Sequence, residues 1–240
     1  MKLLLLSNST MAGKPFLGWP KKYLKNFIGE SPKKILFIPY AGVNVYWPGY
    51  AKKVRDYFAE LGHSTESIYK QNNFGEAIQK TDIIMVGGGN TFHLVYHLHR
   101  NGLIPLIRKA VQDGKPYIGW SAGANVACPT LCTTNDMPII QPDSFEALNL
   151  VPFQINPHYL DANPEGHGGE TREDRINEFL EINRNKIVIG LREGTGLWIE
   201  NDTTKLIGDK PARLFQFGKE PEEADNGKNI EELVNLSMAG

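Results

Sequence analysis

The sequence predicts an α/β protein built on a doubly wound, mostly parallel sheet, with β-hairpins added near its C-terminus. As far as Leu191, short apolar runs alternate with longer amphipathic segments. The runs at 35–38 and 83–86 are apolar at every position, which is typical of parallel strands covered on both faces. An alternation of strands and helices implies βαβ units with right-handed crossovers, and these units build a doubly wound sheet.

The individual elements follow from the same pattern in chain order. Strands are expected at residues 2–6, 34–39, 64–68, 82–86, 116–120, 154–156 and 187–191, and helices at 50–61, 74–80, 91–100, 104–113 and 172–183. Short strand-like pieces with turn residues between them predict antiparallel hairpins at 196–200, 203–207 and 212–217. No repeat, low-complexity tract or linker divides the sequence, so we expect one hydrolytic domain over residues 1–240.

Composition excludes several classes of protein. The 240 residues carry 26 Lys and Arg against 27 Asp and Glu, and this balance argues against a nucleic-acid-binding protein. The only cysteines are Cys128 and Cys132, which argues against a disulfide scaffold and for a reducing cytoplasm, and we expect both thiols to be buried. The four leucines at 3–6 are too few for a signal peptide and fit a buried first strand. No run approaches the roughly 18 apolar residues of a membrane span, so no contact with a membrane is expected.

A serine lies on a sharp turn between a predicted strand and a short helix. Gly119, Ser121 and Gly123 form a G-x-S-x-G pattern at the end of the strand at 116–120. This context is typical of a nucleophile, because the glycines relieve crowding and the helix start directs N–H groups toward a developing oxyanion. The alternative is a tight turn whose glycines serve only helix–strand packing.

The serine needs a base, and the base needs an acid. His158 ends the strand at 154–156 and should emerge at the same sheet edge as Ser121, whereas His167, in a glycine-rich loop, is the weaker candidate. Asp136, in a polar loop, and Glu193, after the strand at 187–191, compete for the role of the acid. Position slightly favours Glu193, because it also leaves the C-terminal end of a strand.

Two further features allow more than one interpretation. His93 and His97 are four residues apart on one helix and could chelate a metal, but no H-E-x-x-H pattern accompanies them, and a partly exposed helix face is the favoured interpretation. The glycines at 87–89 could cradle a phosphate, but no nucleotide-binding signature is present. A serine nucleophile elsewhere favours an oxyanion hole made by one of these amides and that of Ala122.

Seven sequence blocks together resemble peptidase E, the α-aspartyl dipeptidase family. They are collinear and stand at residues 7–10, 37–42, 87–92, 119–125, 133–138, 154–158 and 164–172. The resemblance implies a serine peptidase with a flavodoxin-like sheet, related in architecture to class I glutamine amidotransferases. It also implies hydrolysis of dipeptides with an N-terminal aspartate (Asp-Xaa), without a metal or another cofactor. A monomer or homodimer acting on small peptides is expected.

The resemblance also assigns roles to single residues of this chain. Ser121 would be the nucleophile and His158 the base, and Asp136 would be the acid, against the positional preference for Glu193. The amides of Gly89, Gly88 and Ala122 would form the oxyanion hole. Asn90 and Arg172 would bind substrate, with Arg172 receiving the aspartyl carboxylate.

The position of Arg172 can be argued independently. Thr171 and Asp174 fit a capping box, so Arg172 stands in the first helical turn, where the macrodipole disfavours a cation unless an anion joins it. A substrate carboxylate would supply that anion. The alternative is a surface arginine paired with Glu173 or Asp174.

Two other functions are compatible with parts of the pattern. In a carboxylesterase of the α/β-hydrolase type, the acid and the histidine would each follow a late strand, much further along the chain than His158 stands. A non-catalytic module could use residues 87–91 to bind an anion.

Overall fold

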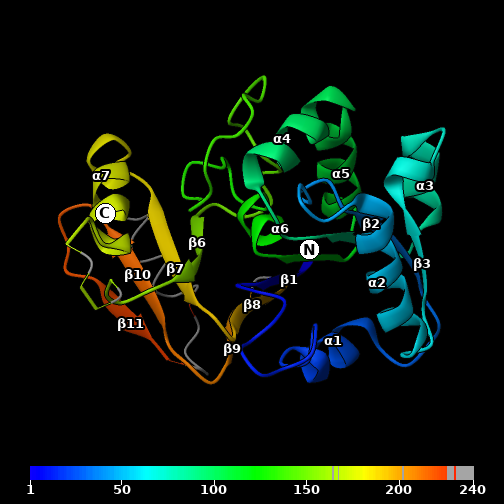
Figure 1. Cartoon of the computed structure of the whole chain (residues 1–240), viewed down its shortest axis with the longest axis horizontal. Coiled ribbons are helices and arrows are strands. Elements are labelled where there is room, and N and C mark those ends of the chain that lie inside the picture. Colours follow the sequence, from blue (N-terminus) through cyan, green and yellow to red (C-terminus); the bar gives the residue numbers. More distant parts are fainter. Residues whose placement is uncertain (164, 167, 202, 226–229, 231–240) are drawn as a thin grey trace.

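The protein folds around two β-sheets (Figure 1). The structure is a computed structural model, and it describes residues 1–163, 165–166, 168–201, 203–225 and 230. The first sheet contains β1 (Lys2–Leu6), β2 (Lys34–Ile38), β3 (Ser64–Ser67), β4 (Ile83–Val86), β5 (Tyr117–Trp120), β8 (Thr195–Glu200) and β9 (Thr203–Gly208). The second sheet contains β6 (Gln154–Tyr159), β7 (Ile187–Arg192), β10 (Ala212–Gln216) and β11 (Glu222–Ala224).

Helices cover both faces of the first sheet. The helical elements are α1 (Lys21–Ile28), α2 (Trp47–Ala59), the 3₁₀ turn Ile68–Lys70, α3 (Phe74–Lys80), α4 (Thr91–Arg100), α5 (Leu103–Gln112), α6 (Ala122–Asn125) and α7 (Arg172–Ile182). Alternate residues of each central strand face opposite clusters of the core, as Leu3 and Leu4 show. One cluster packs against α3, α4 and α5, and the other against α1 and α2. This two-sided burial explains why the strand sequences are apolar at consecutive positions.

The strand order of the first sheet is β3-β2-β4-β5-β1-β8-β9. The strands from β3 to β1 pair in parallel, and the β8–β9 hairpin continues the sheet antiparallel to β1. The prediction of an α/β fold with a mostly parallel central sheet is therefore confirmed. The order reverses between β2 and β4, and in sheets of this kind ligands bind beyond the carboxyl ends of the strands at such a point.

The second sheet differs from the expected arrangement. Its order is β11-β10-β7-β6, with β6 and β7 parallel and the others antiparallel, and α7 covers its outer face (Figure 1). The strands expected at 154–156 and 187–191 thus do not join the central sheet, and the piece at 212–217 pairs with β7. The inner face of this sheet contributes Ile155 and Ile189 to the same core cluster that α4 and α5 pack against. Apolar packing therefore continues from one sheet to the other.

The helix boundaries follow from local capping. Asn73 and Asn90 accept hydrogen bonds from the third residue of α3 and α4, respectively, and Thr171 forms a complete capping box with Asp174. Helix α1 was not predicted from the sequence, because it lacks a side-chain cap and begins after Pro20.

Only one of the two cysteines is buried. Cys128 is buried and its Sγ accepts a hydrogen bond from the amide of Ile155, whereas Cys132 is exposed, so the expectation of two buried thiols is wrong for Cys132. Within the described ranges no helix has the length and apolar character needed to cross a membrane.

Candidate active site

Ser121 occupies a strained turn between β5 and α6. Its φ is 54° and its ψ is −116°, a conformation that costs a non-glycine residue about 1–3 kcal/mol and is concentrated at functional sites. The surrounding turn can be this tight because Gly123 has no side chain. A Cβ atom at Gly123 would lie 2.2 Å from the carbonyl oxygen of Val86. Gly123 thus lets α6 pack closely against β4, which is the helix–strand packing that the alternative interpretation gave to the glycines.

His158 reaches Ser121 from the second sheet. It lies at a register shift of β6, where its own φ is 54°. Its backbone amide donates to the hydroxyl of Ser7, at 2.9 Å, and its Nε2 lies 2.9 Å from Ser121 Oγ. The two residues end strands of different sheets, so the expectation of one common sheet edge is wrong. The bulge turns the imidazole toward β5 and brings the two side chains together.

The acid that contacts His158 is Glu193. Its Oε1 lies 2.8 Å from His158 Nδ1, and both side chains are part-exposed. A carboxylate only accepts hydrogen bonds, so Nδ1 carries the proton and Nε2 is left to accept from the Ser121 hydroxyl. Glu193 follows β7 and His158 stands near the end of β6, and these strands are parallel neighbours. The positional argument in the sequence therefore predicted this pair, and the assignment taken from the resemblance did not.

Asp136 has a different set of partners. Its Oδ2 accepts hydrogen bonds from the amide of Thr91 at 2.7 Å, from the hydroxyl of Thr91 at 2.6 Å and from that of Thr134 at 3.0 Å. The carboxylate thus caps the N-terminus of α4, where a negative charge is favoured by the helix dipole. The expectation that Asp136 orients His158 is corrected here, because Glu193 occupies that position and Asp136 joins the loop at 133–138 to the start of α4.

Two backbone amides near Ser121 are available to an oxyanion. Within the described residues no hydrogen-bond acceptor is paired with the amides of Gly89 or Ala122. Gly89 has φ +138°, and a Cβ atom there would lie 2.2 Å from the carbonyl oxygen of Ala41, so only glycine fits. The amide of Gly88 is not available, because it donates to the hydroxyl of Tyr50 at 3.1 Å. Gly88 is therefore removed from the expected oxyanion hole.

Tyr50 supports this loop from α2. Its hydroxyl also accepts a hydrogen bond from the indole of Trp120, at 2.9 Å. Burial raises the pKa of Tyr50 to about 12, against the opposing effect of these two donors, so the phenol stays neutral. No feature of the sequence indicated this role, because Tyr50 and Gly88 are far apart in the chain and Tyr50 reads as an ordinary core residue of a helix.

Ser7 and Asn8, after β1, support the backbone at His158 and beside Glu193. The Ser7 hydroxyl accepts from the His158 amide and donates to the carbonyl of Leu191 at 2.8 Å. Asn8 Oδ1 accepts from the amide of Gly194 at 3.0 Å, next to Glu193. These residues belong to one of the blocks that carry the resemblance, but no sequence pattern indicated what they contact.

A cavity of about 650 Å³ opens over Ser121 at the reversal point of the sheet. This volume is in the range of small-molecule sites. Ser121, His158 and Gly89 line it together with residues from the loops after β1 and β2 and from α2. Asn90 also lines it, but its amide is engaged with the backbone of His93 and Met137, at 3.0 and 2.9 Å. The expectation that Asn90 binds substrate stays a prediction.

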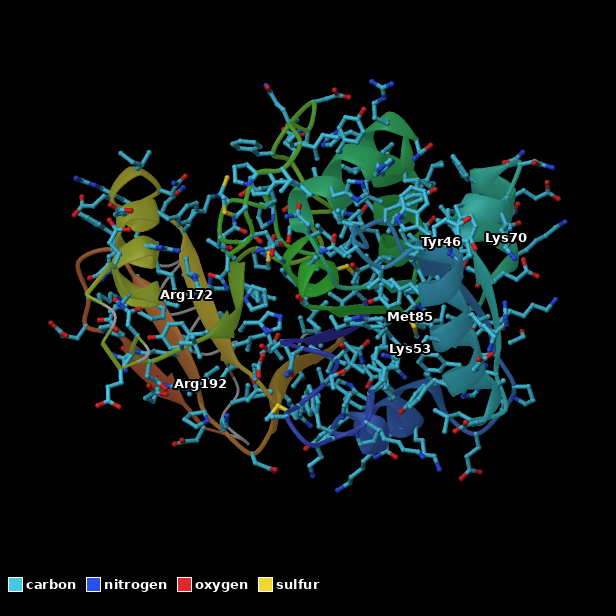
Figure 2. All side chains as sticks on the ribbon, in the orientation of Figure 1. Tyr46, Lys53, Lys70, Met85, Arg172 and Arg192 are labelled. Atoms are coloured by element: carbon cyan, nitrogen blue, oxygen red, sulfur yellow. The ribbon has the colours of Figure 1, made fainter. Side chains whose placement is uncertain are left out.

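Arg172 begins α7 and is half-buried (Figure 2). The acids around it have other partners. Glu173 pairs with Arg213 at 3.1 Å, and Asp174 accepts from Thr171 in the capping box. The alternative of a surface ion pair with these two residues is therefore not what the structure shows. Burial and the charge of Arg175 lower the pKa of Arg172, and the charge of Asp136 opposes this shift.

The remaining histidine candidates take no part in this site. His93 and His97 lie on α4 with intermediate exposure, as the interpretation of a partly exposed helix face predicted. Their Nε2 atoms are 3.2 Å apart, and both rings pack against Trp47. Among the residues that the structure describes, no group of three or more His, Cys, Asp or Glu side chains is placed to hold a metal ion. His167 lies outside the described residues.

The model of peptidase family S51 matches residues 3–207. The chain belongs to peptidase family S51. Among relatives of this S51 chain, peptidase E of Nostoc sp. (strain PCC 7120) is 50% identical over 233 residues, covering 97% of this chain and 96% of the relative. Peptidase E of Salmonella newport (strain SL254) is 46% identical over 220 residues, covering 92% and 96%. The S51 chain is thus a peptidase, and the resemblance to peptidase E is confirmed.

The fold of the S51 chain is also similar to solved structures. The crystal structure of a peptidase from an acI-B1 Actinobacterium superposes with a TM-score of 0.70 at 20% identity, covering 95% of each chain. At this identity the likeness concerns the fold alone. It is consistent with a flavodoxin-like arrangement of the central sheet.

Proposed function

We propose that the protein is a serine dipeptidase that hydrolyses Asp-Xaa dipeptides through Ser121, His158 and Glu193. The observation that carries this proposal is the continuous chain of contacts from Ser121 Oγ to His158 Nε2, at 2.9 Å, and from Nδ1 to Glu193, at 2.8 Å. A hydroxyl, an imidazole and a carboxylate in this order are the elements of acyl transfer by a serine nucleophile.

The first half-reaction acylates Ser121. As Oγ attacks the carbonyl carbon of the substrate aspartate, His158 Nε2 takes the hydroxyl proton, and Glu193 stabilises the imidazolium that results. Collapse of the tetrahedral intermediate breaks the peptide C–N bond. The leaving amine takes the proton from Nε2, so the second amino acid departs neutral at its amine and His158 returns to its starting state.

The second half-reaction releases aspartate. Water attacks the acyl-enzyme ester while His158 accepts its proton, and the proton then passes to Ser121 Oγ as the ester bond breaks. In both halves the negative charge develops on the former carbonyl oxygen. The unpaired amides of Gly89 and Ala122 would hold that oxygen, each contributing on the order of 3 kcal/mol.

Arg172 is the proposed receptor of the aspartyl carboxylate. It is a half-buried cation in the first turn of a helix, where the dipole disfavours it, and the neighbouring acids Glu173 and Asp174 are already paired. An anionic ligand would offset both unfavourable terms, and guanidinium binds carboxylate in a bidentate geometry. Arg172 does not line the cavity over Ser121 in the described residues, so the aspartyl side chain would extend from the cavity toward α7.

A panel of dipeptides tests the proposed function. We expect Asp-Leu to be hydrolysed and Asn-Leu and Leu-Leu to have kcat/KM values lower by about 100-fold or more, because a site built for a charge pair rejects a ligand that leaves it unpaired. Glu-Leu keeps the carboxylate but places it one methylene further from the scissile bond, so it should be hydrolysed more slowly than Asp-Leu. A chelator should not change the rate on Asp-Leu. Hydrolysis of Leu-Leu at a rate near that of Asp-Leu would contradict the proposed specificity.

The role of Arg172 is tested by Arg172→Met. We expect kcat/KM for Asp-Leu to fall by about 30- to 1,000-fold, while the residual hydrolysis of Asn-Leu changes little, since only the aspartyl carboxylate needs the guanidinium. Arg175→Met is the matched control, because Arg175 lies one turn on and pairs with Glu170 at 3.6 Å. Equal losses on both dipeptides would show that Arg172 does not read the carboxylate.

A further inference from the structure

Lys53 brings a positive charge to the cavity over Ser121. It lies on α2 (Figure 2), its side chain lines the cavity, and the residue is exposed. Its Nζ lies 4.3 Å from the ring centroid of Phe16, which lines the same cavity. Within the described part of the chain no carboxylate lies within salt-bridge distance of this ammonium group. The aromatic ring holds the cation without neutralising it.

The rest of the cavity wall has no acid to compete for Lys53. Apart from Lys53 and His158, the described residues that line the cavity have uncharged side chains, including asparagine, serine, threonine and apolar groups. An unpaired ammonium in an uncharged wall attracts a negatively charged ligand.

The helix that carries Lys53 is held close to the reacting centre. Tyr50, three residues earlier and so on the same side of α2, contacts the Gly88 amide at 3.1 Å. A Cβ atom at Gly88 would lie 2.8 Å from Ser121 Cβ, so this loop passes directly over the nucleophile. The face of α2 that carries Tyr50 and Lys53 therefore borders the loop of Gly88 and Gly89.

We propose that Lys53 binds the C-terminal carboxylate of the dipeptide, so that the enzyme recognises both carboxylates of its substrate with positively charged side chains. This inference rests on the proposed function. An Asp-Xaa dipeptide carries two carboxylates, and Arg172, assigned to the aspartyl one, lies on the α7 side, whereas Lys53 lies on the α2 side (Figure 2). The second carboxylate stands only one residue, about 4 Å, beyond the scissile bond. A flexible lysine on the cavity wall has the reach to meet it.

The same contact would select against longer peptides. In a tripeptide the group one residue beyond the scissile bond is a neutral amide, and the nearest carboxylate is displaced by a further residue length of about 3.8 Å. Lys53 then gains no partner from the bound peptide at that position. A preference for dipeptides follows from the placement of one charge and requires no steric barrier.

Binding of intact dipeptides to the Ser121→Ala variant tests the inference. Calorimetry would compare Asp-Leu with Asp-Leu-amide, which lacks only the terminal charge, in the presence and absence of Lys53→Met. We expect Lys53→Met to weaken Asp-Leu binding by about tenfold and to leave Asp-Leu-amide binding within about twofold, because an exposed charge-assisted contact is lost only where the ligand has the charge. Lys53→Arg should retain most of the affinity for Asp-Leu.

Lys52→Met is the matched control. Lys52 is the adjacent lysine of α2, but it pairs with Asp56 at 2.6 Å and does not line the cavity. It should leave the affinity for both ligands unchanged. In the Ser121 enzyme the same substitutions should appear as a change in KM for Asp-Leu and not for its amide.

The outcomes separate this inference from the proposed function. Three outcomes would each overturn the role of Lys53. Lys53→Met could weaken the binding of Asp-Leu and of its amide equally, or neither ligand could bind. A comparison of Asp-Leu with Asn-Leu could also show that the weakening depends on the aspartyl carboxylate instead of the C-terminal one. The proposed function fails separately if the unmodified enzyme cleaves no Asp-Xaa dipeptide. If Lys53→Met leaves the kinetics of Asp-Leu hydrolysis unchanged, the proposed dipeptidase activity stands and only the role of Lys53 in binding the C-terminal carboxylate is overturned.

Discussion

Replacement of Ser121 by alanine is expected to lower kcat for Asp-Leu by about 10⁴- to 10⁶-fold, because no other hydroxyl in the structure contacts His158 Nε2 among the described residues. The variant should keep its fold. Alanine has no larger side chain than serine, and the φ of 54° at this position is equally unfavourable for both residues. Steady-state kinetics with the purified variant, together with its melting temperature, measure both expectations.

A covalent probe distinguishes loss of the nucleophile from an indirect effect. A serine-directed fluorophosphonate should label the unmodified enzyme on the peptide that contains Ser121, and the alanine variant should not be labelled. Hydrolysis of Asp-Leu by Ser121→Ala at more than a small fraction of the original rate would overturn the assignment. A p-nitrophenyl ester offers a second readout, because a general esterase would hydrolyse it well without any aspartyl group.

Local sequence signals predicted the elements that carry the site. The helices at 74–80 and 91–100 match the structure at both ends. An asparagine cap precedes each of them and fixes its first residue. The turn at Ser121 was predictable for a similar reason. A strand, two glycines and a run of small residues leave few conformations other than a sharp strand-to-helix turn.

The second sheet could not be predicted in this way. The runs at 154–156 and 187–191 read as strands, but nothing within them indicates which strands they pair with. Their partners are set by distant segments, as the pairing of β7 with β10 shows. Contacts of single side chains with residues far away in the sequence cannot be predicted from local patterns either. The Ser7 hydroxyl bridges the His158 amide and the Leu191 carbonyl, across 151 and 184 residues of sequence.

The identity of the acid shows how two kinds of inference can disagree. Strand position indicated Glu193, because the carboxyl ends of adjacent parallel strands bring their following residues together. The resemblance indicated Asp136, which lies in a block that marks the family. In the structure Asp136 is close to the site, but it holds the start of α4 and so the loop that carries Gly89. A residue in one of the family's sequence blocks can therefore support the loop beside Ser121 without contacting His158.

Glu193→Gln is expected to lower kcat by about 10³- to 10⁴-fold with little change in stability. Glutamine keeps the size of the side chain, but its NH₂ group can donate to His158 Nδ1. That contact favours the tautomer with the proton on Nε2, which can no longer accept the Ser121 proton. It also removes the negative charge that stabilises the imidazolium.

Asp136→Asn provides the comparison that separates the two acids. Asparagine keeps one oxygen for the amide of Thr91, so the contact that holds the first residue of α4 is weakened and not lost, and Asn90 still caps the helix. We expect the free energy of unfolding to fall by about 0.5–2 kcal/mol. Its effect on dipeptide kinetics would include its influence on Arg172, whose pKa responds to the Asp136 charge, so dipeptide hydrolysis alone does not distinguish the roles.

The rate of Ser121 modification by a neutral fluorophosphonate does distinguish them, because this reagent needs the nucleophile and its base but no aspartyl carboxylate. Glu193→Gln should slow the modification by about 10³-fold, and Asp136→Asn should leave it within about tenfold. The reverse order, with Asp136→Asn slow and Glu193→Gln near normal, would mean that the aspartate orients His158 during the reaction. The contact of 2.8 Å between Glu193 and His158 would then not be the one that activates the serine.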